Sequence, residues 1–283
     1  MKKIFSRPRS LKKTPFHYCP GCGHSLLHRI IGEVIDEMNL QETIIGIPPA
    51  GCAVLAYFYF DIDMGEASHG RGAALATGMK RALPDRVVFT YQGDGDIAAI
   101  GTAETIHAAS RGENFSTIFV NNGVYGMTGG QISPTSPRGS FGSTAPYGAL
   151  EAPFDLAELV TAAGATYVAR WTTAHPLPLS EVIKKGLQNK GFSFIEVISQ
   201  CPTYFGRRNK MRSAVEMMKY LKSQAVVKAK ADKMSEEELA GKIIVGEFAD
   251  RSRPEFSESL QKLIEEKRDK QPEIVKSAYR TEL

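Results

Sequence analysis

The sequence Val87-Val88-Phe89-Thr90-Tyr91 runs directly into Gln92 and then Gly93-Asp94-Gly95-Asp96, and the rest of the chain is organised around this stretch. The apolar, β-branched run predicts a buried strand. A second run, Ile118-Phe119-Val120, leads into Asn121-Asn122-Gly123-Val124-Tyr125-Gly126 after an interval long enough for one helix. Both polar clusters therefore follow the carboxyl ends of strands, where ligands bind in open parallel sheets.

The residue types in these two clusters suit a divalent cation that holds a diphosphate. Mg²⁺ takes oxygen ligands, and proteins usually offer it one or two carboxylates while phosphate oxygens complete its shell. Asp94 can supply the carboxylate and Asn122 a neutral oxygen. The neighbouring glycines let the backbone approach phosphates closely and expose its N–H groups. The alternative is a pair of ordinary glycine-rich turns in an α/β domain.

The composition predicts one large domain with an appendage, because 283 residues with 42% hydrophobic content exceed the usual size of a single domain. The net charge of +4 is only mildly basic, and much of the excess lies in the first thirteen residues, so it does not indicate nucleic-acid binding. No apolar run approaches membrane-spanning length, and the start of the chain lacks the apolar core of a signal peptide. We therefore expect a cytoplasmic protein that binds neither nucleic acid nor a membrane.

The four cysteines, Cys19, Cys22, Cys52 and Cys201, each fall at a predicted helix start or strand end. Without a secretory signal they indicate metal or redox use rather than a disulfide framework. Cys19 and Cys22 precede a helix whose positive N-terminus is expected to lower their pKa values. Four converging thiolates would suit Zn²⁺ or a [4Fe-4S] cluster. Because Cys52 and Cys201 are isolated in the sequence, spacing alone leaves ordinary buried thiols equally open.

Elsewhere strands and helices alternate, which predicts an α/β fold with a mostly parallel sheet flanked by helices. The stretch 55–60 is expected to form a buried apolar wall, and the long loop 126–152 to close over a ligand or to meet a partner. Further strands are expected at 43–47, 167–170 and 192–198, and helices at 25–38, 69–83, 155–163 and 179–189.

The chain is predicted to have three parts. Residues 1–16 are basic and punctuated by proline, which indicates a mobile or partner-docked arm. Residues 17–205 contain the motifs and form the ligand-binding domain. Beyond Phe205 the chain is rich in lysine and glutamate with few predicted strands, so residues 206–283 are interpreted as a helical C-terminal appendage that serves as a subunit interface.

The motifs resemble a known family. G-D-G followed by N-N is similar to the fingerprint of thiamine diphosphate enzymes. Together with C-P-G-C-G-H from Cys19, H-G-R from His69, Y-G-M-T-G-G-Q from Tyr125 and C-P-T from Cys201, it resembles the β subunit of the 2-oxoacid:ferredoxin oxidoreductases. The resemblance covers about residues 17–206 and is specific, because several independent motifs occur in one order.

This resemblance implies which residues bind the cofactors. Mg²⁺ would be held by Asp94, Asn122 and the backbone carbonyl of Val124, and a [4Fe-4S] cluster beside the thiamine diphosphate would be carried by the four cysteines. His69, at a predicted helix start, is a candidate contact for cofactor or substrate, with a capping role as its alternative. The other residues expected to line the cofactor are Ala50, Gly51, Cys52, Ala53, Gly95, Asp96, Gly126 and Met127.

The resemblance also implies oxidative decarboxylation of a 2-oxoacid with coenzyme A, giving acyl-CoA, CO₂ and reduced ferredoxin. The glutamate that activates the cofactor is expected from the α subunit, since Glu66 and Glu104 lie in no matching motif. One alternative is a non-redox thiamine decarboxylase or carboligase, which has no use for four placed cysteines, and another is a zinc-stabilised scaffolding subunit. The sequence leaves 2-oxoglutarate and branched-chain 2-oxoacids equally open as substrates.

Overall fold

The computed structural model describes residues 6–268, and the strands of this part form one eight-stranded sheet in the order β2-β1-β3-β4-β6-β5-β8-β7. All neighbouring pairs are parallel except β5 and β8, which are antiparallel. The expected α/β fold with a mostly parallel sheet is confirmed. The strands are β1 (Ile44–Ile47), β2 (Asp63–Met64), β3 (Val87–Gly93), β4 (Ser116–Asn121), β5 (Tyr167–Thr172), β6 (Ser193–Ile198), β7 (Ala225–Val227) and β8 (Ile243–Asp250).

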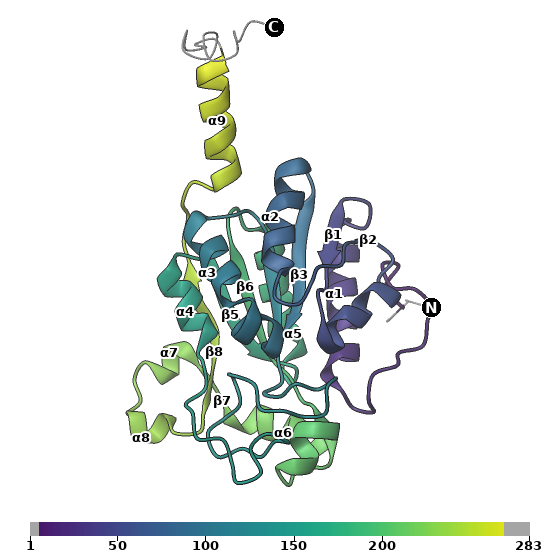
Figure 1. Cartoon of the computed structure of the whole chain (residues 1–283), viewed down its shortest axis with the longest axis vertical. Coiled ribbons are helices and arrows are strands. Elements are labelled where there is room, and N and C mark those ends of the chain that lie inside the picture. Colours follow the sequence, from purple (N-terminus) through teal and green to yellow (C-terminus); the bar gives the residue numbers. More distant parts are fainter. Residues whose placement is uncertain (1–5, 269–283) are drawn as a thin grey trace, which may run out of the picture.

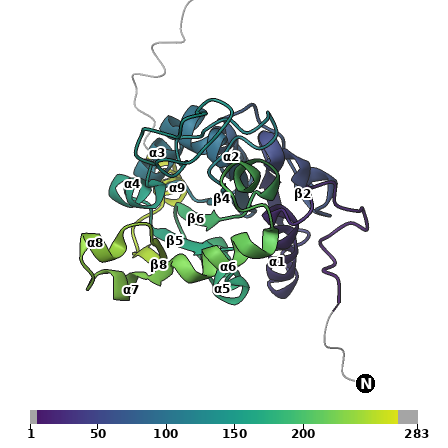
Figure 2. The same ribbon diagram turned by 90° about the horizontal axis from the view of Figure 1, so that it is seen from below.

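Helices cover both faces of the sheet, with α1 and α5 on one face and α2, α3 and α4 on the other (Figure 2). The α-helices in the described residues are α1 (Gly23–Glu37), α2 (Gly72–Ala82), α3 (Thr102–Arg111), α4 (Leu156–Ala163), α5 (Pro176–Gln188), α6 (Ala214–Gln224), α7 (Lys228–Ala231), α8 (Glu236–Leu239) and α9 (Phe256–Arg268). A 3-10 helix spans Gly51–Phe58, and short π-helices span Gly95–Ile100 and Pro202–Gly206.

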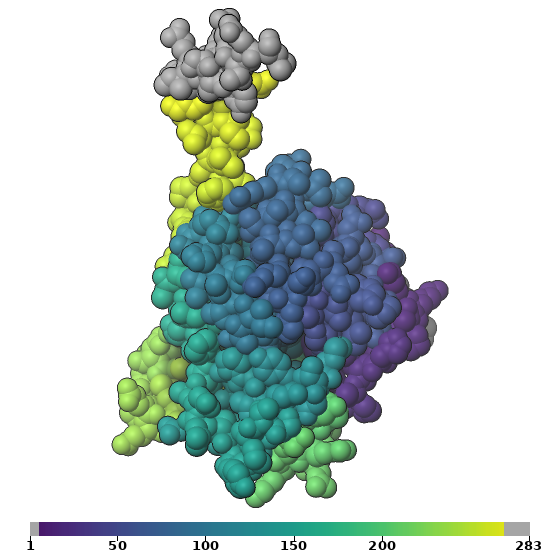
Figure 3. Space-filling view, viewed as in Figure 1, coloured from purple at the N-terminus to yellow at the C-terminus, as the bar shows by residue number. Residues whose placement is uncertain are grey.

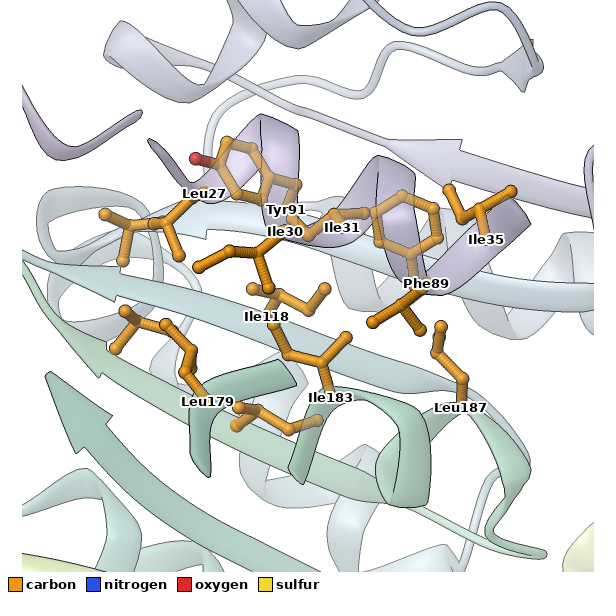
Figure 4. Close-up of a cluster of buried hydrophobic side chains, with 14 of the residues drawn as sticks. Leu27, Ile30, Ile31, Ile35, Phe89, Tyr91, Ile118, Leu179, Ile183 and Leu187 are labelled. Carbon is orange, nitrogen blue, oxygen red and sulfur yellow. The ribbon is translucent and has the colours of Figure 1, made fainter. Parts of the chain in front are cut away.

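Each central strand contributes to two hydrophobic cores, because successive side chains of a strand point to opposite faces. On β4, Ile118 and Val120 lie in one core and Phe119 lies in the other. Figure 4 shows the first core, where side chains of α1 and α5 converge on those of β3 and β4. Burial on both faces explains why β3 and β4 read as continuous apolar runs in the sequence.

The carboxyl ends of β1, β3, β4 and β6 lie side by side, since these strands are neighbours in the sheet. They lead respectively into Ala50-Gly51-Cys52, Asp94, Asn122 and Cys201. The long connection from β4 to α4 has no helix or strand, as expected, and lies at this end of the molecule (Figure 1, lower end; Figure 3, teal). The fold thus gathers the candidate site residues at one edge.

Two expectations need correction. The stretch 55–60 is not uniformly a buried wall: Tyr59 and Phe60 are fully buried, whereas Tyr57 and Phe58 are 37% and 41% exposed, because a 3-10 helix turns them outward. The C-terminal part is not wholly helical, since β8 pairs with β5 in the main sheet. The division of the chain at residue 206 stays a prediction, and residues 269–283 lie outside the described part.

The described part of the predicted N-terminal arm packs on its own chain. The Lys12 N–H group donates to the Tyr59 carbonyl (2.8 Å), and the Asp61 N–H group donates to the Ser10 carbonyl (2.8 Å). Leu11 is buried in the core beside α1. Within residues 6–268, no helix combines the length and apolar character needed to cross a membrane.

Candidate functional site

Asp94 lies at the end of β3, 3% exposed, with its carboxylate surrounded by donors. Its oxygens accept from the N–H groups of Gly95 (2.9 Å) and Val124 (2.8 Å), and from the hydroxyls of Ser133 (2.7 Å) and Thr135 (3.2 Å). Burial nevertheless raises the pKa of Asp94 to about 6. A cation bound here would relieve the cost of this buried negative charge, so the residue suits a metal ligand.

The two asparagines after β4 have different surroundings. Asn121 is turned inward: its amide donates to Glu196 (2.8 Å), and its side-chain oxygen accepts from Thr135 (2.9 Å). Asn122 lines the cavity beside Asp94, and its oxygen accepts from the Val124 N–H group (3.1 Å). The second asparagine is therefore the candidate ligand, while the first fastens the loop to the sheet.

A buried ion pair supports Asn121 from behind. Arg170 on β5 donates from Nε to Glu196 on β6 (2.7 Å), and these residues are register partners. Burial alone would lower the pKa of Arg170, but Glu196 and Asp155 raise it above its ordinary value. Since Glu196 also accepts from Asn121, the sheet holds the loop at a defined position relative to Asp94.

The cavity is open where a cofactor would need space. A Cβ atom added at Gly51, whose φ is +69°, would meet nothing within 4 Å, and the same holds for Gly93. At Gly95 a Cβ atom would lie 2.0 Å from Tyr125, so only glycine fits there. All predicted cofactor and Mg²⁺ residues line this one cavity: Ala50, Gly51, Cys52, Ala53, His69, Asp94, Gly95, Asp96, Asn122, Val124, Gly126 and Met127.

Asp96 and His69 form a pair at the cavity wall. The carboxylate of Asp96 is 2% exposed and contacts His69 Nδ1, the Gly70 N–H group (2.6 Å) and the Gln92 amide. An ionised carboxylate only accepts, so Nδ1 carries the proton and Nε2 is an acceptor in the neutral ring. Asp96 therefore orients His69 as well as lining the cavity.

His24 also lines the cavity and was not assigned a role from the sequence. Its Nδ1 atom is 2.6 Å from the Tyr91 hydroxyl, its ring stacks on Tyr18, and burial lowers its pKa to about 4. A neutral imidazole at the cavity wall is the consequence. The motif C-P-G-C-G-H could have indicated this role, because its histidine lies in the first turn of α1, two residues after Cys22.

The four cysteines lie at the same edge of the sheet, within electrostatic range of one another, although 182 positions separate the first from the last. Burial raises the pKa of Cys22 to about 12, and negative charges on Cys201, Cys52 and Cys19 would raise it further. Burial raises the pKa of Cys52 to about 11, again with contributions from Cys201 and Cys19. The expected lowering of thiol pKa by the α1 N-terminus is wrong for Cys22, because desolvation outweighs the helix end.

The thiols suit a cluster that displaces their protons, since metal sites require the deprotonated form. In the described part of the chain, no three Cys, His, Asp or Glu side chains lie close enough to share a single metal ion. A [4Fe-4S] cubane, which offers one iron to each thiolate, does not require that closeness. Cys52 belongs to both sites, because it lines the cavity and lies within electrostatic range of the other three cysteines.

Neither candidate glutamate reaches the cavity. Glu66 is exposed, and Glu104 forms an ion pair with Arg71. Neither glutamate is among the residues that line the cavity. This placement agrees with the expectation that an activating carboxylate comes from another subunit.

The fold and the cavity define a thiamine-dependent class of protein. The family described as thiamine pyrophosphate enzyme, C-terminal TPP-binding domain, matches residues 51–197, which include both polar clusters. The chain therefore has a thiamine pyrophosphate-binding domain.

Relatives define the family more narrowly. The chain is 52% identical over 269 residues to 2-oxoglutarate synthase subunit KorB of Methanothermobacter marburgensis, covering 95% of this chain and 94% of the relative. It is 40% identical to ketoisovalerate oxidoreductase subunit VorA of the same organism, covering 97% of this chain and 58% of the relative. A solved 2-oxoglutarate:ferredoxin oxidoreductase from Magnetococcus marinus superimposes with a TM-score of 0.82 at 28% identity, over 93% of this chain and 91% of that one.

The chain thus belongs to the family of β subunits of 2-oxoacid:ferredoxin oxidoreductases, and it is a subunit of an oxidoreductase composed of several subunits. The resemblance inferred from the motifs is confirmed, and the comparisons favour this function over the non-redox alternative.

Proposed function

We propose that this chain holds thiamine diphosphate, Mg²⁺ and a [4Fe-4S] cluster, and that its complex oxidises 2-oxoglutarate. One observation carries the cofactor assignment: Cys52 lines the cavity with Asp94 and Asn122 and also interacts electrostatically with the other cysteines. When bound, thiamine diphosphate supplies the electron sink that decarboxylation of a 2-oxoacid needs, and the cluster accepts single electrons. An oxidative reaction requires the two sites to adjoin in this way.

The chain's own residues hold and orient the reactants. Asp94, Asn122 and the Val124 carbonyl would bind the cation, because they offer oxygen atoms at adjoining strand ends. Asp96 fixes the orientation of His69, which can accept a hydrogen bond from a bound molecule. Backbone N–H groups near the glycines would approach the diphosphate. The other residues that would contact the cofactor are Ala50, Gly51, Cys52, Ala53, Gly95, Gly126 and Met127.

The α subunit, ferredoxin and coenzyme A complete the proposed reaction. The α subunit would supply the activating glutamate, since Glu66 and Glu104 do not line the cavity. Coenzyme A would take the acyl group and ferredoxin the electrons. A cytoplasmic location stays a prediction.

The choice of 2-oxoglutarate rests on relatedness. Identity to the KorB relative exceeds identity to VorA, and only the former matches over nearly its whole length. The Magnetococcus marinus structure has 2-oxoglutarate, coenzyme A and succinyl-CoA bound. No basic side chain lines the described cavity other than His69 and His24, so the distal carboxylate would meet a cation of the α subunit.

The test is CoA-dependent reduction of methyl viologen by the anaerobically purified complex. We expect kcat/KM for 2-oxoglutarate to exceed that for ketoisovalerate by about tenfold or more, because a site with a charge for the distal carboxylate rejects an apolar acid. The opposite preference would overturn the substrate assignment. Full-rate CO₂ release without coenzyme A or an electron acceptor would instead support a non-redox enzyme. The isolated chain is expected to be inactive.

A further inference from the structure

The cysteine site has an inner side and an outer side. Cys52 lines the cofactor cavity and Cys201 is buried, whereas Cys19 is exposed together with Pro20 and Gly21 of the same loop. Electrons that enter a cluster from the cavity side would therefore leave it near Cys19. The surface around this loop is where an acceptor must approach.

Cations are concentrated on that surface. Arg207, Arg208, Lys210 and Arg212 follow the turn that begins after Cys201, and α6 adds Lys219 and Lys222. All six side chains are exposed. Residues 207–222 contain these six cations and a single carboxylate, so their net charge of +5 exceeds the +4 of the whole chain.

These charges are available to a partner. In residues 6–268, none of the six cations forms an ion pair with a carboxylate. The nearby carboxylate of Glu216 is engaged at the start of α6, where it accepts from the Ser213 N–H group (3.4 Å). The positive charge is therefore not compensated within the described structure.

The shape of the surface also fits a docked protein. One hollow is lined by Pro20, Pro202, Thr203, Arg207 and Arg212. A mainly apolar groove adjoins the same loop at Gly21, and its other lining residues are Ala174, Gln200, Ala214, Val215, Met218, Lys219 and Lys222. The loop rests directly on α6, because a Cβ atom at Gly21 would lie 2.3 Å from the Ala214 Cβ atom. An apolar centre with a charged rim is the usual anatomy of a protein interface.

We propose that this surface, made of Pro20, Gly21 and residues 202–222, docks a small acidic iron–sulfur electron carrier against the Cys19 side of the cysteine site. The proposal rests on the proposed function, since a carrier is required only where a cluster releases electrons. Charge complementarity identifies the occupant: an acidic protein would be steered to the cations, while the apolar groove would hold it in contact.

Electron transfer at this surface balances simply. At each docking of a carrier with one cluster, the resident cluster loses one electron and the carrier gains one. Two dockings remove the two electrons released when one 2-oxoacid is oxidatively decarboxylated. No proton or bond change is needed at the docking surface itself.

The test compares two charge reversals in the assembled complex. Arg207→Glu/Arg212→Glu changes the proposed surface, and Lys230→Glu/Lys233→Glu changes two exposed cations at α7, on the edge of the molecule away from α1 (Figure 2). Calorimetry with an oxidised, acidic [4Fe-4S] ferredoxin should show about tenfold or greater weakening for the first variant at low ionic strength, because opposite charges become like charges. The difference should shrink at high salt. The control should bind within about twofold of the unmodified complex.

Kinetic measurements distinguish an effect on carrier docking from an effect on the rest of the enzyme. The first variant should raise KM for ferredoxin and leave the iron content, the methyl viologen rate and the KM for coenzyme A unchanged. Unchanged ferredoxin affinity would overturn the proposal. A raised KM for coenzyme A alone would assign the arginines to its phosphates, and loss of the α subunit would assign them to the subunit interface; either result overturns it. An unmodified complex that oxidises no 2-oxoacid with methyl viologen would instead refute the proposed function.

Discussion

At the scale of single residues, Asp94 and Asp85 show how position gives the same side chain different chemistry. Both flank β3, but Asp85 lies in the exposed turn before the strand and Asp94 is buried after it. Asp94 is held by four hydrogen bonds and still has a raised pKa, because desolvation exceeds their combined effect. A bound cation would stabilise the ionised form of such a buried carboxylate strongly, because water does not.

The first prediction at this scale is that Asp94→Ala abolishes thiamine diphosphate binding. The variant removes the carboxylate that we propose as the cation ligand, whereas the other cavity carboxylate, Asp96, is engaged with His69, and calorimetry with Mg²⁺ and thiamine diphosphate should show a loss of about a hundredfold or more. Circular dichroism should report an intact fold, because Asp94 lies at the end of β3 outside both hydrophobic cores, although its four hydrogen bonds are lost. Asp85→Ala is the matched control and should bind normally. Undiminished affinity of Asp94→Ala would refute the assignment of this residue.

At the scale of elements, the loop after β4 owes its position to contacts that cross the sheet. Arg170 on β5 pairs with Glu196 on β6, and Glu196 in turn accepts from Asn121 at the end of β4. Removing one member of a buried pair leaves the other charge without compensation. The loop and the sheet are therefore coupled through a few polar side chains.

We expect Arg170→Met to lower the free energy of unfolding by about 3–5 kcal/mol, because Glu196 stays buried without its cation. Urea unfolding of the complex, followed by the fluorescence of Trp171, measures this change. Lys185→Met is the matched control: it breaks an exposed ion pair with Glu247 (2.6 Å) and should cost no more than about 1 kcal/mol. Equal effects of the two substitutions would contradict the role given to the Arg170–Glu196 pair.

Local patterns explain which elements could be predicted. The apolar runs at β3, β4 and β6 are buried on both faces, so they are visible in the sequence. β8 was missed, because its partner β5 lies over 70 residues earlier and its burial pattern is mixed. The outward turn of Tyr57 and Phe58 depends on the 3-10 helix, which a hydrophobic run does not reveal. The Arg170–Glu196 pair could not be predicted either, since it depends on β5 and β6 being neighbours in the sheet.

At the scale of the whole molecule, strand order brings the cysteines together. C-x-x-C predicts that Cys19 and Cys22 face one point, but Cys52 and Cys201 join them only because the neighbouring strands β1, β3, β4 and β6 end side by side. The site lies at one end of the molecule and α9 projects from the other (Figure 1). Leu260, Leu263 and Ile264 on α9 are 37–50% exposed, which supports the prediction that this C-terminal part contacts another subunit.

The last prediction is that Cys19, Cys22, Cys52 and Cys201 jointly hold one [4Fe-4S] cluster. A cubane needs one ligand for each iron, and the chain has no further cysteine to replace a lost one. Replacing any of the four by alanine should therefore lower the iron content of the anaerobically purified complex and reduce electron transfer to ferredoxin. Decarboxylation without oxidation should fall less, because it depends on the cavity around Asp94 rather than on the cluster.

The cysteine variants also distinguish alternative ligand sets. About four irons retained in every variant, or zinc in place of iron in the unmodified protein, would refute the cluster. If only Cys52→Ala or Cys201→Ala retained iron, the Cys19–Cys22 pair would stay as ligands and another side chain would complete the set. Since Cys52 is the cysteine that lines the cofactor cavity, its loss should in addition weaken thiamine diphosphate binding, whereas loss of the exposed Cys19 should not. Calorimetry on the two variants measures that difference directly, and equal affinities would show that the cavity and the cysteine site are independent.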